Sequence, residues 1–284
     1  MRIRVLAAES LGVRSMCVEV ECRETRLLID PGAALGPRRY GLPPDQMEWR
    51  RLHTLRERIR KRLSLADTVI ITHYHFDHYT PDWAEDLRGK RVLIKDPVRN
   101  INRSQARRAA EFVKRLSMAG VQWEVAEGRR LRLPGVEVHL SGPLWHGPET
   151  RFGCVMAVAV KEGGESFLHT SDVSGPVHPE ILDFIKKVRP EVLLVDGPST
   201  YLGPRYGHEA LSVSRRNLIS LVRDMGISIL ILEHHLLRDL GWRKWAEPIF
   251  EAATQKGTLV FSGAEFSGEK ETLLEAERKK RYQK

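Results

Sequence analysis

The sequence predicts a layered α/β (α+β) fold, in which two sheets pack face to face and helices cover their outer sides. Three short apolar strands come first, strands then alternate with helices, and this alternation returns in the second half of the chain. Two facing sheets with helices outside would bury all of these apolar runs. No Pro/Ser-rich linker and no repeat of fixed period interrupts residues 1–284, so one domain is the simplest organisation.

The first half of the chain alternates apolar runs with turn signals. An Asp-Pro-Gly turn follows the third strand, and a loop rich in Gly and Pro leads to the first helix. We expect strands at residues 3–7, 16–20, 26–29, 67–72 and 91–96, and a second helix at 104–118 that Gly120 ends. The first helix has an apolar stripe: Trp49, Leu52, Leu55, Ile59 and Leu63.

The second half begins with shorter strands and continues with alternating helices and strands. We expect strands at residues 121–126, 131–133, 136–140, 155–160, 166–169, 191–196, 227–233 and 258–261. Helices are expected at residues 179–188, 209–225 and 242–256, and a charged helix follows the last strand.

Composition indicates a globular protein of a reducing compartment. No run of about 18 apolar residues is present, so no membrane span is expected. The first residues lack a long apolar segment, and we expect no secretory signal. The three cysteines are few, odd in number and not in CxxC spacing, which argues against a disulfide framework. We therefore expect a cytoplasmic location.

The formal net charge of +9 is concentrated in two segments, residues 50–62 and 88–115. Clustered positive charge suits a polyanionic substrate such as RNA. Solvated helix faces rich in arginine are also common without any such partner. Both interpretations stay open, and nothing in the sequence predicts an oligomeric state.

A group of metal-type side chains follows the fourth strand, in the segment "THYHFDHYTPDW". His73 and His75 are two positions apart, so on an extended segment both imidazoles point the same way and can reach one ion. Asp77 and His78 lie where a helix is expected to start and can turn to a second ion. Histidine with carboxylate suits zinc, iron or manganese better than calcium or magnesium. The alternative is a polar surface loop.

Other histidines and aspartates follow later strands. His146 lies in a Gly/Pro loop, Asp172 comes just past a strand, and His234 and His235 come just past another. Each alone has an ordinary explanation, such as a turn cap for the aspartate. Their recurrence at strand ends makes coincidence a poor explanation.

This pattern resembles the metallo-β-lactamase superfamily over most of the chain. The segment "HYHFDH" fits the HxHxDH signature of that superfamily, and Asp30 in "LLIDPG" matches its early supporting aspartate. The segments "SLGVRSM", "LLIDPGAALGPRRYGLPP" and "THYHFDHYTPDW" are similar to an archaeal family of predicted hydrolases of unestablished substrate. The resemblance implies a four-layer αββα sandwich of two mixed sheets, with the metals at one edge.

The resemblance also implies two divalent metals, with zinc expected and iron or manganese as alternatives. The first metal would be held by His73, His75 and His146. The second would be held by Asp77, His78 and His234, and Asp172 would bridge the two. A hydroxide between the metals would be the nucleophile, oriented by Asp77. The last ligand is assigned to His234 because "HHLLR" resembles the H-F-S-x-R segment of transfer-RNA-maturing endonucleases, which leaves His235 as a supporting or core residue.

Several further residues are candidates for substrate chemistry. His208 lies where the endonuclease branch has a histidine that helps to protonate the leaving group, although it can also be only the first residue of a helix. His169 is a weaker candidate for the same role. Arginines in two loops can bind a phosphate through the guanidinium fork, namely Arg38, Arg39, Arg99 and Arg103. The alternatives are a polar loop for the first pair and a helix start capped by an asparagine or Ser104 for the second.

The sequence therefore predicts a dinuclear metal-dependent hydrolase with a phosphodiesterase or ribonuclease type of activity. Hydrolysis of a small ester, thioester or lactone on the same fold is the alternative. A hypothesis of another class is a non-catalytic nucleic-acid-binding protein that its metals stabilise.

Overall fold

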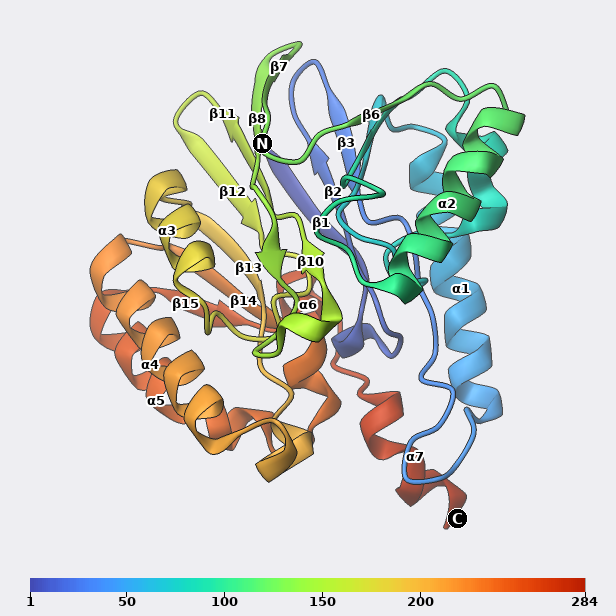
Figure 1. The fold of residues 1–284 in the computed structure, drawn as a ribbon. Helices are drawn as coiled ribbons and strands as arrows, with labels where there is room; N and C mark the ends of the chain where they lie inside the picture. Colours follow the sequence, from blue (N-terminus) through green and yellow to red (C-terminus); the bar gives the residue numbers. More distant parts are fainter. Residues whose placement is uncertain (284) are drawn as a thin grey trace.

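Two β-sheets pack face to face in the computed structural model, which describes residues 1–283, and helices line both outer sides (Figure 1). The first sheet has neighbouring strands in chain order: β1 (Arg2–Ala8), β2 (Met16–Glu21), β3 (Arg26–Ile29), β4 (Thr68–Ile71), β5 (Arg91–Ile94) and β6 (Trp123–Val125). The pairs from β1 to β3 are antiparallel, and those from β3 to β6 are parallel.

The second sheet repeats this mixed arrangement. Its strands in spatial order are β15 (Leu259–Phe261), β14 (Ile229–Glu233), β13 (Val192–Asp196), β12 (Glu165–His169), β11 (Val158–Glu162), β8 (Val136–Leu140) and β7 (Arg130–Leu133). The four strands β12 to β15 are parallel, and the rest pair antiparallel. A short ribbon of β9 (Leu144–Trp145) and β10 (Cys154–Val155) lies beside the sheets.

The helices fall into two layers (Figure 1). The first layer contains α1 (Gln46–Leu63) and α2 (Arg103–Met118), and the second contains α3 (Pro179–Val188), α4 (His208–Met225) and α5 (Trp242–Lys256). The chain ends with α6 (Gly263–Phe266) and α7 (Leu274–Tyr282). Short 3-10 turns complete it: η1 (Glu9–Leu11), η2 (Pro81–Leu87), η3 (Thr150–Phe152), η4 (Thr200–Arg205) and η5 (His234–Arg238). The predicted four-layer αββα sandwich is confirmed.

One buried cluster joins the inner faces of the two sheets. Val18 and Ile70 of the first sheet and Val138 and Phe167 of the second belong to it. The outward side chains of the second sheet, such as Leu193, form another cluster with α3, α4 and α5. The parallel strands are thus buried on both faces, which is why they read as unbroken apolar runs.

Three local expectations were wrong. Trp49 is 56% exposed, because Glu48 takes the buried position at that end of the α1 stripe. The strand expected at 155–160 is broken, since the Met156 N–H donates to the Thr72 carbonyl instead of a sheet partner (3.1 Å). Asp77 and His78 lie in a turn that the His78 N–H closes on the His75 carbonyl (2.9 Å), not at a helix start.

No helix within residues 1–283 is both long enough and apolar enough to cross a membrane. The carboxyl ends of β3 and β4 and those of β12, β13 and β14 carry the polar loops that matter below. Because parallel strands end at a common edge, loops that are distant in sequence meet there.

Candidate metal centre

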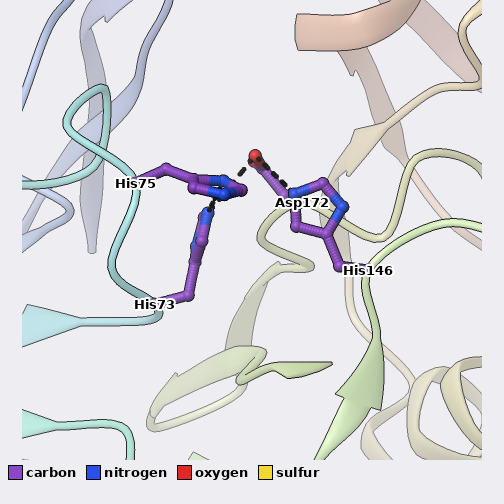
Figure 2. Close-up of side chains that lie close together, drawn as sticks. All are labelled: His73, His75, His146 and Asp172. Atoms are coloured by element: carbon purple, nitrogen blue, oxygen red, sulfur yellow. Dashed lines mark hydrogen bonds and ion pairs between the residues drawn. The ribbon is translucent and has the colours of Figure 1, made fainter. Parts of the chain in front are cut away.

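The loop after β4 brings His73 and His75 together. His73 Nε2 and His75 Nδ1 are 3.0 Å apart, and both rings face Asp172 and His146 across the gap between the two sheets (Figure 2). The Asp172 Oδ2 atom lies 3.4 Å from His73 Nε2 and 3.5 Å from His146 Nε2. These four residues offer ligand atoms that all lie within 4.8 Å of one another.

A second set shares Asp172 with the first. It contains Asp77, His78 and His234, and its ligand atoms also lie within 4.8 Å of one another. His78 Nε2 is 2.9 Å from Asp172 Oδ1, and His234 Nε2 is 3.3 Å from Asp172 Oδ2. The Asp77 Oδ2 atom lies 3.7 Å from His234 Nε2. The structure thus gathers all seven of the predicted ligands around one carboxylate.

The donor atoms fit two divalent cations. Within the described chain, His146 Nε2 is buried without a hydrogen-bond partner, and His78 Nε2 and Asp172 Oδ1, although 2.9 Å apart, do not meet in hydrogen-bond geometry. Buried polar atoms normally have one, so their convergence needs an explanation such as a bound ion. Imidazole nitrogens with carboxylate oxygens form a donor set that suits zinc, iron or manganese.

Burial keeps most of these imidazoles in the neutral form that binds metals. It lowers the pKa of His75 to about 3 and that of His234 to about 4. Burial alone would raise the pKa of Asp172, but the imidazoles of His234, His78 and His73 hold that pKa well below its usual range. His78 is the exception: burial alone would lower its pKa, but the carboxylates of Asp172 and Asp30 raise it, so a cation that binds its Nε2 must displace a proton.

Asp30 supports the metal loop, as the resemblance implied. The Thr72 N–H and hydroxyl donate to its two oxygens (2.8 and 2.6 Å), and His78 Nδ1 donates to Oδ2 (2.8 Å). The bond to Nδ1 turns His78 Nε2 toward Asp172. Asp30 also sits two residues before Gly32, where a Cβ atom would lie 2.2 Å from the Tyr79 nitrogen. Only glycine allows the two loops to approach so closely.

The backbone is strained around the cluster. Asp30, Ser171, Ser174 and His234 all have φ between 47° and 58°, the left-handed region that non-glycine residues rarely adopt. Such residues cluster at functional sites because the surrounding contacts hold them there. The strain therefore points to the same place as the ligand geometry.

The structure separates the two adjacent histidines that the sequence left open. His234 N–H donates to the Glu233 carboxylate (3.0 Å), and its ring faces Asp172. His235 turns away, and its Nδ1 donates to Asp196 (2.9 Å), which also accepts from the His235 N–H (3.0 Å). The His235 ring still lies near the cluster, with its centre 5.8 Å from that of His146.

The other two candidate histidines, His169 and His208, lie outside the two sets of predicted metal ligands. His169 is buried, and its Nε2 donates to the Met16 carbonyl (2.9 Å) while Nδ1 accepts from the Ser171 N–H (3.1 Å). It therefore holds the backbone before Asp172. His208 is the exposed first residue of α4, and within residues 1–283 its side chain makes no hydrogen bond or ion pair.

The predicted arginines also differ. Arg38, Arg99 and Arg103 are exposed, and Asn102 accepts from the Gln105 N–H as the cap of α2 (2.8 Å). Arg39 is half-buried, and its Nη2 donates to the Arg238 carbonyl (2.8 Å). Of these four arginines, only Arg39 thus makes a hydrogen bond to η5, the segment that carries the proposed metal ligand His234.

Sequence reasoning missed three residues beside the cluster. Arg238 is buried, and its Nη2 lies 3.1 Å from His234 Nε2 and 3.8 Å from Asp77 Oδ2. Its Nε donates to the buried Glu9. The sequence feature that could have indicated Arg238 is its spacing, because it lies four residues after the predicted ligand His234. Asp196 ends a strand in "LLVD", the same pattern that drew attention to Asp30, whereas Glu9 had no local signal.

Comparisons with known proteins agree with this geometry. The family model described as "Beta-lactamase superfamily domain" matches residues 25–235. A "UPF0282 protein" of Korarchaeum cryptofilum is 43% identical over 286 residues, covering 100% of this chain and 95% of the relative.

Solved structures show the same fold at low identity. CmlA, a diiron beta-hydroxylase from Streptomyces venezuelae, has a TM-score of 0.57 at 15% identity, covering 92% of this chain and 52% of its own. An isothiocyanate hydrolase from Delia radicum gut bacteria has a TM-score of 0.57 at 13% identity, covering 88% and 94%. The family model and the end-to-end relative show that the chain belongs to the metallo-β-lactamase superfamily and, within it, to the archaeal UPF0282 proteins.

Proposed function

We propose that the protein is a dinuclear metal-dependent hydrolase of phosphodiesters, with RNA as the class of substrate. The observation that carries the proposal is Asp172, whose two oxygens reach both ligand sets and so bring two cation sites side by side. Two divalent cations bound there would lower the pKa of a shared water and offset the charge that develops on a phosphodiester. We expect zinc, with iron and manganese as the alternatives.

Asp77 has a different role from the other ligands. Its side chain keeps 15% of its surface exposed, whereas Asp172 keeps 2%. A partly accessible carboxylate at the cluster can accept a hydrogen bond from the attacking water and orient it. Arg238 Nη2, 3.8 Å away, limits the positions that this carboxylate can take.

His235 is our candidate for the residue that meets the leaving group, in place of His208. Asp196 accepts from its Nδ1–H, so Nε2 of the neutral ring is bare; it can take a proton from the attacking water and then give that proton to a leaving oxygen. The test compares a p-nitrophenyl with an alkyl leaving group. We expect His235→Gln to slow release of the alkoxide far more than release of p-nitrophenolate, and His208→Gln to affect neither. Equal effects on both leaving groups would contradict this assignment.

The proposed function is tested by metal analysis together with hydrolysis of bis(p-nitrophenyl) phosphate, p-nitrophenyl acetate and a thioester. Near two metals per chain and phosphodiesterase activity are expected for the wild type. Asp77→Ala should lose more than the roughly 10–100-fold typical of a supporting residue. Activity on esters or thioesters alone would replace phosphodiesters with the alternative substrates. Failure to retain zinc, manganese or iron after reconstitution would reject the metal centre.

The basic segment 50–62 offers less free charge than its composition indicated. Arg58 pairs with Glu269, Arg60 with Asp86 and Arg62 with Glu19. These partners lie far away in sequence, so the pairing could not be read from the segment itself. Charge that is to meet a phosphodiester must therefore be sought nearer the metal centre.

A further inference from the structure

Two arginines near the metal centre have no carboxylate partner within residues 1–283. Arg39 donates only to a backbone carbonyl, and Arg108 Nη2 donates to the Ser104 hydroxyl (3.2 Å). The Nε atom of each is buried and makes no hydrogen bond in the described chain. This contrasts with Arg58, whose guanidinium is paired. An uncompensated guanidinium beside a reaction centre is a ready anion site.

Arg39 is held beside the backbone of Arg238, whose side chain contacts His234 and Asp77. Its guanidinium carbon lies 4.0 Å from the centre of the Tyr201 ring and 4.7 Å from that of Tyr40. The two rings flank the cation and limit its motion. Its hydrogen bond to the Arg238 carbonyl connects it to the residue that contacts His234.

Arg108 reaches the cluster from α2. Its guanidinium carbon lies 5.4 Å from the centre of the Phe76 ring, and Phe76 lies between two of the proposed ligands, His75 and Asp77. Phe76 is 47% exposed, although it is a large apolar side chain. Phe76 and Arg108 therefore place an exposed ring and a cation without a carboxylate partner in residues 1–283 next to the loop that carries His75 and Asp77.

A second exposed ring lies beside His146. The centres of the Phe152 and His146 rings are 6.0 Å apart, and Phe152 is 38% exposed. Its backbone is anchored, because its carbonyl accepts from Asn102 Nδ2 (2.9 Å) and Gln105 Nε2 (3.1 Å). Phe76 also contacts the Tyr79 ring (5.8 Å between centres), and the Arg151 guanidinium carbon lies 5.0 Å from the centre of the Phe152 ring, but both phenylalanines keep a large exposed surface that a ligand can contact.

We propose that Arg39, Arg108, Phe76 and Phe152 form a recognition rim for a nucleotide. The two guanidiniums bind the phosphodiester, and a base stacks on a phenylalanine ring. Aromatic rings bind bases of any sequence in this way, and a guanidinium fork matches phosphate oxygens. The rim deepens the proposed function, on which it rests, by naming single-stranded nucleic acid as the substrate. A small ester would use neither the free cations nor the flat rings.

The first experiment uses two substrates with the same reacting bond and leaving group, thymidine 5′-(p-nitrophenyl phosphate) and methyl p-nitrophenyl phosphate. For the zinc-loaded wild type, kcat/KM should be about tenfold or more higher for the nucleoside substrate, as expected for one stacked base. In Phe76→Leu or Phe152→Leu, the ratio of kcat/KM for the nucleoside substrate to that for the methyl ester should fall toward one. A wild type without preference would overturn the stacking role.

The second experiment removes the cations. Arg39→Met and Arg108→Met should raise KM for both phosphodiesters at least about tenfold, which is a larger effect than any change in kcat. Arg107→Met on the same helix and Arg50→Met on α1 are matched controls, since both side chains are exposed and lie outside the rim. Metal content and melting temperature verify that each variant is folded. Unchanged KM in the two rim variants would overturn the anion role.

A binding measurement separates failure of the rim from failure of the proposed function. Adenosine monophosphate is titrated into zinc-loaded protein by calorimetry. Binding that Arg108→Met weakens and Arg107→Met does not would support the rim even if no phosphodiester is hydrolysed. Normal phosphodiesterase activity with no nucleotide binding at millimolar concentration would reject the rim and leave the proposed function intact.

Discussion

Replacing Arg278 with methionine is expected to lower the free energy of unfolding by about 3 kcal/mol, because it leaves the carboxylate of Glu48 buried without its main partner. The two side chains are 0% and 1% exposed. Arg278 Nε and Nη2 donate to the two oxygens of Glu48 at 2.8 and 2.7 Å. Loss of one partner of such a pair typically costs about 3–5 kcal/mol. We expect the lower end, because Arg281 Nη2 stays 3.2 Å from Glu48.

The same substitution should also affect substrate binding. Arg278 Nη2 donates to the Gly36 carbonyl (2.9 Å) and Nη1 to the Leu42 carbonyl (3.0 Å), so α7 anchors the loop that carries Arg39. Without these bonds the loop is less constrained. KM for phosphodiesters should therefore rise, whereas the metal content should not change.

Equilibrium urea unfolding of the zinc-loaded protein measures the stability effect. The double variant Glu48→Leu/Arg278→Met is the control, because removing both charges leaves no uncompensated carboxylate and should recover most of the loss. It should not restore KM, since the donors to Gly36 and Leu42 are still missing. A loss below about 1 kcal/mol in Arg278→Met, or no recovery in the double variant, would refute this reasoning.

Three further predictions concern the supports of the centre and of α7. Asp30→Asn should weaken zinc binding about 10–100-fold in a competition titration, because the ring of His78 loses its acceptor. Gly32→Ala should lower both metal content and melting temperature, whereas Gly164→Ala, where a Cβ meets nothing within 4 Å, should change neither. Burial would raise the pKa of Glu275, but hydrogen bonds from Arg14 lower it to about 2 from 4.5. Its stabilisation is therefore complete above pH 4.5 and is lost as the pH falls toward 2, by at most about 3 kcal/mol, and Glu275→Gln should flatten this part of the stability curve.

Local signals were enough to predict most elements. The helices α3 (Pro179–Val188) and α5 (Trp242–Lys256) have the predicted bounds, because a proline marks the start of α3 and a glycine, Gly257, follows the end of α5. The strand β8 (Val136–Leu140) also agrees, since its alternating pattern gives one buried face. The bounds of these elements depend on interactions between residues that are close in sequence, so the sequence alone is enough to predict them.

Features that depend on distant partners could not be predicted. The difference between His234 and His235 comes from Glu233, Asp196 and a left-handed backbone, none of which spacing reveals. In the same way, Arg58 is paired because Glu269, 211 positions away, lies beside it in the fold, whereas Arg108 meets no carboxylate within residues 1–283. A count of charges along the chain gives no information about such pairs.

A buried carboxyl group at the end of each of three strands positions the loops of the metal centre. The strands β3, β13 and β14 end in "LLID", "LLVD" and "LILE", and the final carboxylates are Asp30, Asp196 and Glu233. Each is buried and accepts a backbone N–H of a neighbouring loop: Asp30 from Thr72, Asp196 from Ser174 and Glu233 from His234.

These three carboxyl groups accept hydrogen bonds at or next to the residues whose backbone is strained. Ser174 and His234 have positive φ, as does Asp30 itself, and backbone hydrogen bonds donated to these carboxyl oxygens offset strain of about 1–3 kcal/mol per residue. The ligand loops are therefore positioned by the protein's own carboxylates, and the cations enter a geometry that already exists. Apolar strands that each end in a carboxylate are thus a sequence signal for a preorganised loop edge, separate from the histidine motif beside it.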